Sequence, residues 1–274
     1  MPRPEFTVGI EEEYLLVDPK TRDLVRDPPE ELMARVAEVI GEGQVGPEFL
    51  RSQIEVGTKV CDTLTEAQSE LCRLRRAVAT IADEYGAAPI AVSTHPFASW
   101  RDQLTTDRER YVTLARDMGT VMRRLVICGM HVHVGVSDND LRIDLINQLS
   151  YFLPHILALS CSSPFWHGMD TGLKSYRRSV FRAPPRTGLP EMFSSWSEYE
   201  RHVRVLVETG SIEDASKIWW DVRPSVRYPT IEMRVADICT TLADGVAVAA
   251  VFLCILGMLY RLRLENQRWR SYAR

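Results

Sequence analysis

Five short apolar segments of the sequence carry ionisable side chains at every second position. Because residues i and i+2 of a β-strand share a face, each segment would present one apolar face and one ionisable face. The residues on the ionisable faces are, segment by segment, Glu11 and Glu13; Arg51, Gln53 and Glu55; His131 and His133; Asp221 and Arg223; and Glu232 and Arg234. A solvated outer sheet face is the ordinary explanation for one such strand. Five strands rich in Glu, His and Arg, and poor in the Lys, Thr and Ser of a plain solvated face, favour a functional site instead.

Carboxylates, imidazoles and guanidinium groups gathered on one sheet face indicate metal and phosphate chemistry. Clustered carboxylates repel one another, so a cation is their natural partner, and Glu oxygens suit Mg²⁺ or Mn²⁺. The arginines would then neutralise the oxygens of a phosphoryl group during its transfer. His131 and His133 could instead hold zinc, but the sequence has no H-E-x-x-H motif and its other four histidines form no ligand cluster.

Motifs that bind a nucleotide through a loop do not occur in the sequence. It contains no G-x-x-x-x-G-K-S/T, no G-x-G-x-x-G and no G-x-S-x-G pattern. A nucleotide, if one binds, must therefore be held by metal and arginines on a sheet.

The elements that must position these residues alternate irregularly along the chain. Strands are predicted at 6–17, 49–59, 88–94, 126–136, 218–222 and 230–238, and helices at 30–40, 63–85, 107–125, 138–159, 197–208 and 244–267. Thr63 and Glu66 form a capping box that would open the second helix. Arg73, Arg75 and Arg76 of that helix are expected on its solvated face. The irregular order of strands and helices indicates an α+β fold with an antiparallel or mixed sheet.

Composition limits the class of protein. The chain has 274 residues with 33 Lys+Arg against 37 Asp+Glu, and its net charge of −4 argues against nucleic acid as a partner. Most basic residues are arginines, which is typical of GC-rich codon usage, although a subset could bind phosphate or carboxylate through two hydrogen bonds.

Six cysteines without a C-x-x-C pair are expected to be reduced thiols of a cytoplasmic protein. The apolar run 245–260 falls short of the ~20 residues that span a bilayer, so it predicts a buried core helix and no membrane segment.

Six sequence blocks, spread over almost the whole chain, resemble those of one family in the same order. They are TVGIEEEYLLVDP, RSQIEVGTKVC, GMHVHVGV, YRRSVFRAPPRTGLP, IWWDVRPS and PTIEMRVADICTTLADGVAVAA. These blocks are similar to the carboxylate–amine ligases of the glutamate–cysteine ligase type 2 family, which is related to glutamine synthetase. The resemblance implies an α+β fold in which a curved antiparallel sheet forms a funnel with helices on its outer face. It also implies one catalytic domain over residues 1–274 that lacks the family's C-terminal segment.

The activity implied by the resemblance is ATP-dependent ligation, with Mg²⁺ or alternatively Mn²⁺ as cofactor. The γ-carboxylate of glutamate, or of a similar acid, would be phosphorylated to an acyl phosphate that an amine then attacks. Carried over by motif, the implied metal ligands are Glu11, Glu13, Glu55 and Glu232; the nucleotide-side groups are His131, His133 and Arg178; and the anion-binding catalytic groups are Arg182, Arg223 and Arg234. The segment 162–190, which contains Arg178 and Arg182, would form a lid over the nucleotide.

Two alternatives stay open at the level of the sequence. One is a shortened, catalytically weak paralogue that would bind nucleotide or a protein partner, and the other is a metal-dependent hydrolase. The ligase is the favoured hypothesis. It would act in the cytoplasm on a small acid and an amine, without a membrane or nucleic-acid partner, and the resemblance is compatible with a homodimer. The identity of the amine is not encoded in any spacing of the sequence.

Overall fold

An antiparallel sheet forms the framework of the computed structural model, which describes residues 4–270 apart from the side chain of Arg110. Within those residues the sheet has seven strands in the order β10-β11-β5-β1-β3-β2, and β4 also pairs with β1. The strands are β1 (Val8–Val17), β2 (Val45–Pro47), β3 (Gln53–Gly57), β4 (Ala88–Ile90), β5 (Met130–Gly135), β10 (Val222–Pro224) and β11 (Thr230–Met233). Every pairing in this sheet is antiparallel.

The register of the sheet aligns the ionisable faces of neighbouring strands. Glu13 of β1 lies opposite Glu55 of β3, and Glu11 lies opposite His131 of β5. On the other side of β5, His133 lies opposite Glu232 of β11. Because opposed residues of an antiparallel pair point to the same face, the side chains that the sequence pattern singles out converge on one side of the sheet.

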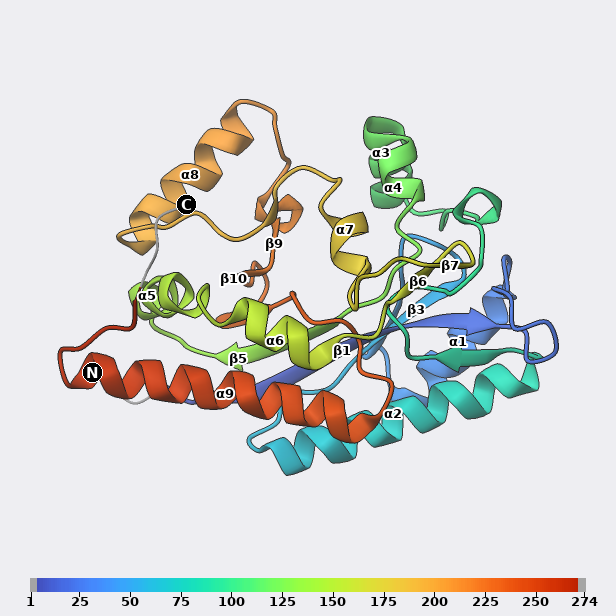
Figure 1. Ribbon diagram of the computed structural model, residues 1–274, viewed down its shortest axis with the longest axis horizontal. Helices are drawn as coiled ribbons and strands as arrows, with labels where there is room; N and C mark the ends of the chain where they lie inside the picture. The colour runs from blue at the N-terminus through green and yellow to red at the C-terminus, as the bar shows by residue number, and fades with distance from the viewer. Residues whose placement is uncertain (1–3, 271–274) are drawn as a thin grey trace.

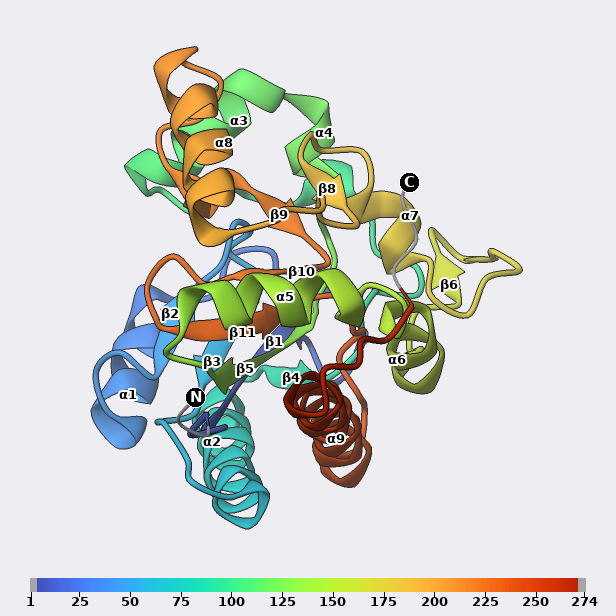
Figure 2. The same ribbon diagram turned by 90° about the vertical axis from the view of Figure 1, so that its left-hand side faces the viewer.

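Helices cover the apolar face of the sheet (Figures 1 and 2). They are α2 (Leu64–Glu84), α5 (Asn139–Leu149), α6 (Leu153–Ser160) and α9 (Leu242–Leu264), with α1 (Glu30–Ile40) packed beside α2. Ile10, Ile54 and Val134 of the apolar face are at most 1% exposed. The α+β class and the antiparallel sheet with helices on its outer face are therefore confirmed.

Smaller elements stand over the ionisable face of the sheet. They are η1 (Trp100–Asp102), α3 (Glu109–Met118), α4 (Thr120–Arg123), α7 (Arg177–Phe181), α8 (Trp196–Glu208) and η2 (Ala215–Lys217). The segment 162–190, expected as a loop, also contains the paired strands β6 (Phe165–Trp166) and β7 (Met169–Asp170) and the short strand β8 (Thr187–Gly188), which pairs in parallel with β9 (Trp219–Trp220). Figure 1 shows α3, α7 and α8 on the side of the sheet opposite α2 and α9.

Several element boundaries differ from the sequence prediction for local reasons. The helix predicted at 107–125 is two helices, because Gly119 between them has a positive φ of 51°. The helix predicted at 138–159 is α5 and α6, and Pro154 lies in the first turn of α6, where its missing N–H costs nothing. Thr63 caps α2 as predicted, but the Glu66 carboxylate accepts a hydrogen bond from the N–H of Asp62.

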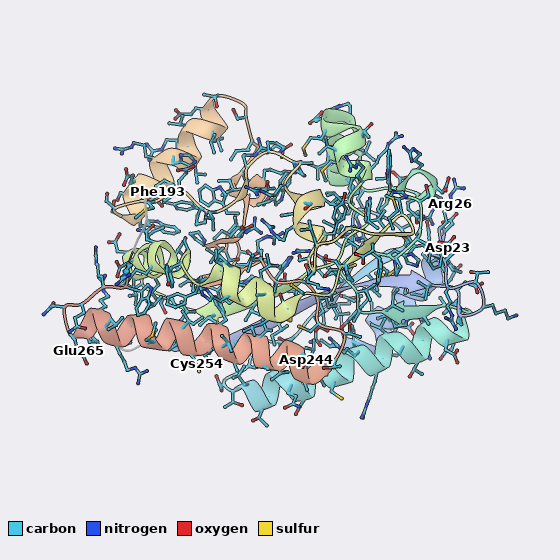
Figure 3. The ribbon with its side chains drawn as sticks, in the orientation of Figure 1. Asp23, Arg26, Phe193, Asp244, Cys254 and Glu265 are labelled. Atoms are coloured by element: carbon cyan, nitrogen blue, oxygen red, sulfur yellow. The ribbon has the colours of Figure 1, made fainter. Side chains whose placement is uncertain are left out.

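Helix α9 is apolar around its whole circumference but is buried on one side only. Val248, Phe252 and Leu256 are buried, whereas Cys254 is exposed (Figure 3). The prediction of a buried core helix is therefore correct for one face. Among residues 4–270, α9 is also the one helix long and apolar enough to cross a membrane, a criterion that core helices of other proteins meet as well.

A buried ion pair crosses the apolar layer, contrary to the expectation that Arg75 is solvated. Glu12 of β1 is 0% exposed, and Arg75 of α2 donates to both of its carboxylate oxygens at 2.6 and 2.7 Å. Tyr14 donates to the same carboxylate at 2.5 Å. Arg75 also donates to the carbonyl oxygens of Cys239 and Thr240, each at 3.0 Å. This network joins α2, β1 and the segment that leads into α9.

We expect Arg75→Met to lower the free energy of unfolding by about 3–5 kcal/mol, because it leaves the Glu12 carboxylate buried without its cation. Arg76→Met, at an exposed position one residue further along α2, is the matched control and should change stability by less than about 0.5 kcal/mol. Urea denaturation followed by circular dichroism measures both. Equal effects of the two substitutions would show that Arg75 is merely a surface residue.

Candidate active site

The ionisable face of the sheet forms the floor of a large cavity. The cavity has a volume of about 1150 Å³ and lies between the sheet and the elements that stand over it, including α3, α7 and η2. Its lining includes all but two of the site residues expected from the sequence, namely Glu11, Glu13, Glu55, His131, His133, Arg223, Glu232 and Arg234. The two that do not line it are Arg178 and Arg182.

Three carboxyl groups lie close together in the cavity. Oxygens of Glu13, Glu48 and Glu55 lie within 4.8 Å of one another. Burial, followed by repulsion from Glu48, raises the pKa of Glu13 to about 7, and the same two causes raise the pKa of Glu55 well above its ordinary value. Clustered, desolvated carboxylates of this kind are stabilised by a cation, and their hard oxygens suit Mg²⁺ or Mn²⁺.

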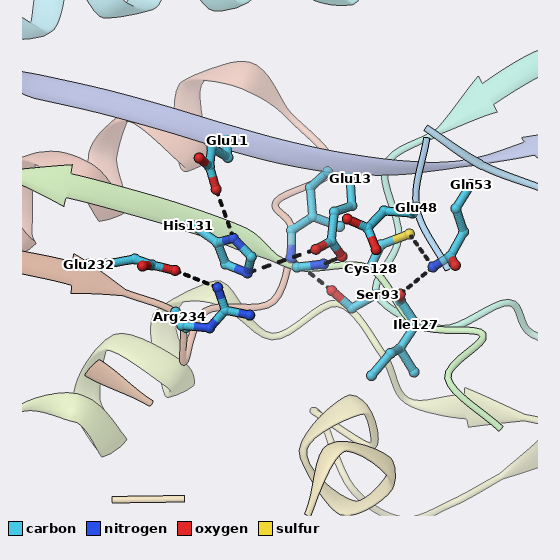
Figure 4. Close-up of polar contacts among 12 residues, drawn as sticks. Glu11, Glu13, Glu48, Gln53, Ser93, Ile127, Cys128, His131, Glu232 and Arg234 are labelled. Atoms are coloured by element: carbon cyan, nitrogen blue, oxygen red, sulfur yellow. Dashed lines mark hydrogen bonds and ion pairs between the residues drawn. The ribbon is translucent and has the colours of Figure 1, made fainter. Parts of the chain in front are cut away.

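Glu48 is a site residue that the sequence pattern misses. It follows β2, a three-residue strand, and the carbonyl oxygen of Glu48 accepts a hydrogen bond from the Thr106 hydroxyl at 2.6 Å. Its position is set by the turn between β2 and β3, so no period-2 alternation marks it. Figure 4 shows Glu48 beside Glu13.

Two carboxylates and a histidine form a second group beside the first, with His133 next to them. Oxygens and nitrogens of Glu11, Glu55 and His131 lie within 4.8 Å of one another. His131 Nδ1 is 3.1 Å from Glu11 Oε2, and His133 Nε2 is 3.4 Å from Glu11 Oε1. Burial, followed by repulsion from Arg234, lowers the pKa of His131 to about 4, so its imidazole is neutral at neutral pH. A neutral imidazole beside carboxylates can coordinate a metal or accept a hydrogen bond.

Glu232 is engaged by two arginines. Arg223 donates to both carboxylate oxygens of Glu232 at 2.9 and 3.0 Å, and Arg234 contacts the same carboxylate (Figure 4). Although burial opposes ionisation, these two guanidinium groups hold the pKa of Glu232 well below its ordinary value. Among the described residues Glu232 belongs to neither group of candidate metal ligands. In this structure it orients arginines, which differs from the metal-ligand role that the resemblance implies.

The two arginines that hold Glu232 differ in what they leave for a ligand. Arg223 also donates to the carbonyl oxygens of Ser216 and Ile218, at 3.2 and 2.6 Å. Arg234 lines the cavity, and its buried Nε has no hydrogen-bond partner. Arg234 is therefore the better placed of the two to bind an anion in the cavity.

Arg177 of α7 is a further arginine in the lining of the cavity. It is 2% exposed, lines the cavity and leaves its buried Nε without a hydrogen-bond partner. Gly129 allows this placement, because a Cβ atom there would lie 2.3 Å from the guanidinium of Arg177. The neighbouring Arg178 instead forms an ion pair with Asp221 at 2.5 Å, and Arg182 is exposed at the end of α7. The geometry thus favours Arg177 over Arg178 and Arg182 as the anion-binding residue of this segment.

Asp237 holds in place the segment that positions Arg177 in the cavity. Its fully buried carboxylate accepts hydrogen bonds from Ser162 N, Ser163 Oγ and Ser175 Oγ at 2.7–3.0 Å. Ser163 Oγ in turn accepts a hydrogen bond from the N–H of Arg177 at 3.1 Å. One carboxylate next to β11 therefore ties together both ends of the 162–175 loop and the start of α7.

Solved structures share this architecture. The glutamate–cysteine ligase of Francisella tularensis, solved in complex with AMP, aligns with a TM-score of 0.72 at 15% identity, over 99% of this chain and 68% of that one. A bifunctional glutathione synthetase from Pasteurella multocida aligns with a TM-score of 0.70 at 16% identity, over 92% of this chain and 39% of that one. At these identities the likeness shows the fold alone.

Sequence comparisons identify the family. The model of glutamate-cysteine ligase family 2 matches residues 7–270. A protein of Rhodospirillum rubrum named "Putative glutamate--cysteine ligase 2" is 64% identical over 277 residues, which cover 100% of this chain and 71% of the relative. A protein of the same name from Paracoccus denitrificans is 56% identical over 269 residues, covering 98% of this chain and 71% of the relative. The chain therefore belongs to glutamate-cysteine ligase family 2, a family of ligases.

Proposed function

We propose that the protein is an ATP-dependent carboxylate–amine ligase that joins the γ-carboxylate of glutamate, or of a similar acid, to an amine. A carboxylate oxygen of the acid attacks the γ-phosphorus of ATP and ADP leaves; the amine then attacks the acyl carbon and phosphate leaves. The observation that carries the proposal is the placement of three half-buried carboxylates and two incompletely bonded arginines in one cavity. Membership of the family supports the same class of reaction.

Divalent metal fits the carboxylates of the cavity. Glu13, Glu48 and Glu55 would hold one ion, and Glu11 with His131 offers a neighbouring position that shares Glu55. Bound there, Mg²⁺ or Mn²⁺ would neutralise charge on the phosphate oxygens of the nucleotide. The raised pKa values of Glu13 and Glu55 are the physical sign that these side chains need a cation to ionise together at neutral pH.

The cavity arginines supply the remaining positive charge. Arg177 and Arg234 each carry N–H groups with no acceptor, in a desolvated setting where hydrogen bonds to an anion are strong. Glu232 fixes the guanidinium of Arg234, so little reorganisation is needed when a phosphoryl group arrives. Neither the phosphorylation of the acid nor the attack of the amine requires a covalent bond to the protein.

The reaction is proposed to take place in the cytoplasm. All six cysteines are free in the structure, which supports a reducing, cytoplasmic location. A homodimer stays a prediction from the resemblance.

Incubation with ATP, Mg²⁺ and glutamate should give ADP release that depends on an added amine. A panel of amines that includes cysteine is screened by a coupled ADP assay, with glutamate omitted as the control. Nucleotide binding without turnover for any amine would favour the catalytically weak paralogue. Bound zinc by elemental analysis together with no affinity for ATP would contradict both functions.

Substituting a carboxylate of the three-residue group should abolish metal-dependent nucleotide binding. We expect Glu48→Gln and Glu55→Gln each to weaken Mg²⁺-dependent ADP binding by more than about 100-fold, since even the partners of metal ligands are worth about 10–100-fold. Isothermal titration calorimetry with and without Mg²⁺ measures the effect. Glu38→Gln, at an exposed position of α1 outside the cavity, is the control and should bind normally. Normal binding by both cavity variants would show that the metal position is wrong.

Arg177 and Arg182 can be compared directly by conservative substitution. Arg177→Lys keeps the charge but loses the planar fork, and we expect kcat to fall by about 10²–10³. Arg182→Lys should lower kcat less than about threefold, because the side chain is exposed outside the cavity. Steady-state kinetics measures both variants, with the amine that the ADP-release screen selects. The opposite order of effects would restore Arg182 as the anion-binding residue.

A further inference from the structure

A second groove lies on the other side of the turn between β10 and β11. It has a volume of about 740 Å³ and is bounded by α8, the first turn of α5 and the turn 225–229. The same turn contributes to the wall of the main cavity. The size of this groove is within the range of about 300–1,000 Å³ that is typical of sites for small molecules.

The groove is held in shape by a small core separate from the main one. Ile143 of α5, Phe193, Tyr199 of α8 and Trp220 belong to this cluster, and Figure 3 labels Phe193 beside α8. The start of α8 is also tied to α5, because the N–H of Trp196 donates to Asp140 at 2.7 Å. The walls of the groove are therefore fixed by packing and hydrogen bonds.

Arg142 is a buried cation in the wall of this groove. It is 5% exposed, and its guanidinium lies 4.8 Å from the ring centroid of Trp196. One Nη donates to the side chain of Asn139, while the buried Nε has no hydrogen-bond partner. Among the described residues no carboxylate lies within ion-pair distance of Arg142.

The acidic residues near Arg142 are held elsewhere. Asp138 acts on Arg142 through its charge, but its carboxylate caps α5 by accepting from the N–H of Leu141 at 2.8 Å. The Asp140 carboxylate accepts from Trp196, as described above, and Tyr199 of α8 also acts electrostatically on Arg142. A buried guanidinium without a bound carboxylate is costly in free energy, and an anion in the groove would remove that cost.

The other residues that line the groove indicate the chemistry of the rest of such an anion. Aromatic and branched aliphatic side chains form most of the surface around Arg142, namely Trp196, Tyr199, Val203, Val207, Val226 and Tyr228. Arg204 and Arg227 add positive charge and Glu200 adds one negative charge, so the groove carries a net positive charge. A purely inorganic anion would leave the apolar surface uncovered.

We propose that this groove is a second ligand site that takes a small organic carboxylate with an aromatic or branched aliphatic body. The carboxylate pairs with Arg142, whose planar fork matches its two oxygens, and the body packs on Trp196 and Tyr199. The site needs neither metal nor nucleotide. It is therefore independent of the proposed ligase activity in the main cavity.

Phenylacetate is the probe, titrated by calorimetry into the protein without ATP or metal. We expect saturable binding with a dissociation constant on the order of 1 mM or tighter. Phenylacetamide, which has the same body without the charge, should bind at least about tenfold more weakly, and Arg142→Gln should lose about tenfold for phenylacetate. Arg201→Gln, on α8 but outside the groove lining, should bind like the parent protein.

A second variant keeps the test decisive if Arg142→Gln fails to fold. Val207→Trp fills the groove from an exposed position of α8, whereas Val205→Trp adds the same bulk outside the groove. We expect the first substitution to abolish phenylacetate binding and the second to leave it unchanged. No saturable binding up to about 20 mM, equal binding of the amide, or unchanged binding by Val207→Trp would each overturn the proposal. Because ATP turnover is not measured, failure of the ligase assay has no bearing on this result.

Discussion

Burial of like charge on one face of an antiparallel sheet is the constraint on which the rest of this structure depends. The register sets Glu13 opposite Glu55, and the turn after β2 adds Glu48 to the same place. Burial and mutual repulsion raise the pKa values of Glu13 and Glu55, so the three carboxylates cannot ionise together without compensation. The stability for such an arrangement has to come from elsewhere in the molecule. Burial of the apolar face of the same sheet against the helices stabilises the fold.

The same sheet also carries ionisable groups that are compensated internally. Glu12 projects to the opposite face from Glu11 and Glu13 and is paired with Arg75, so a charge in the core is balanced within the core. Glu232 is balanced by Arg223 and Arg234. Carboxylates with cationic partners therefore organise the structure, whereas the carboxylates whose neighbours are other carboxylates form the proposed metal site. All of these carboxylates belong to glutamates, so the charge of the neighbouring side chains distinguishes the two kinds.

Arginines divide in a similar way. Arg223 donates to Glu232 and to backbone carbonyl oxygens, and Arg178 pairs with Asp221 while its buried Nη1 has no hydrogen-bond partner. Arg177, Arg234 and Arg142 each keep a buried Nε without an acceptor, the first two in the main cavity and the third in the groove beside α8. The turn 225–229 separates the two spaces and lines both of them. The arginines therefore include some that are bound by acceptors of the protein itself and a few that are proposed to bind an anion.

Much of the site could be predicted from the sequence because a strand dictates side-chain direction locally. The period of two placed Glu11, Glu13, Glu55, His131 and His133 on one face, and the structure shows all of them lining one cavity. The capping residue Thr63, the apolar run of α9 and the order of the family's sequence blocks are likewise properties of short segments. Such features can be predicted from the sequence because they depend on residues only a few positions away.

Tertiary structure alone decided the features that depend on residues far apart in the chain. Glu48 joins Glu13 across 35 positions of sequence through a turn, and Arg75 reaches Glu12 across 63. The placement of Arg177 in the cavity depends on the hydrogen bonds of Asp237 and on the space above Gly129. The alternation of side chains along a strand indicates the face on which a residue lies, but not which residues of other segments lie opposite it. That information exists only once the strands, the 162–175 loop and the helices are packed together.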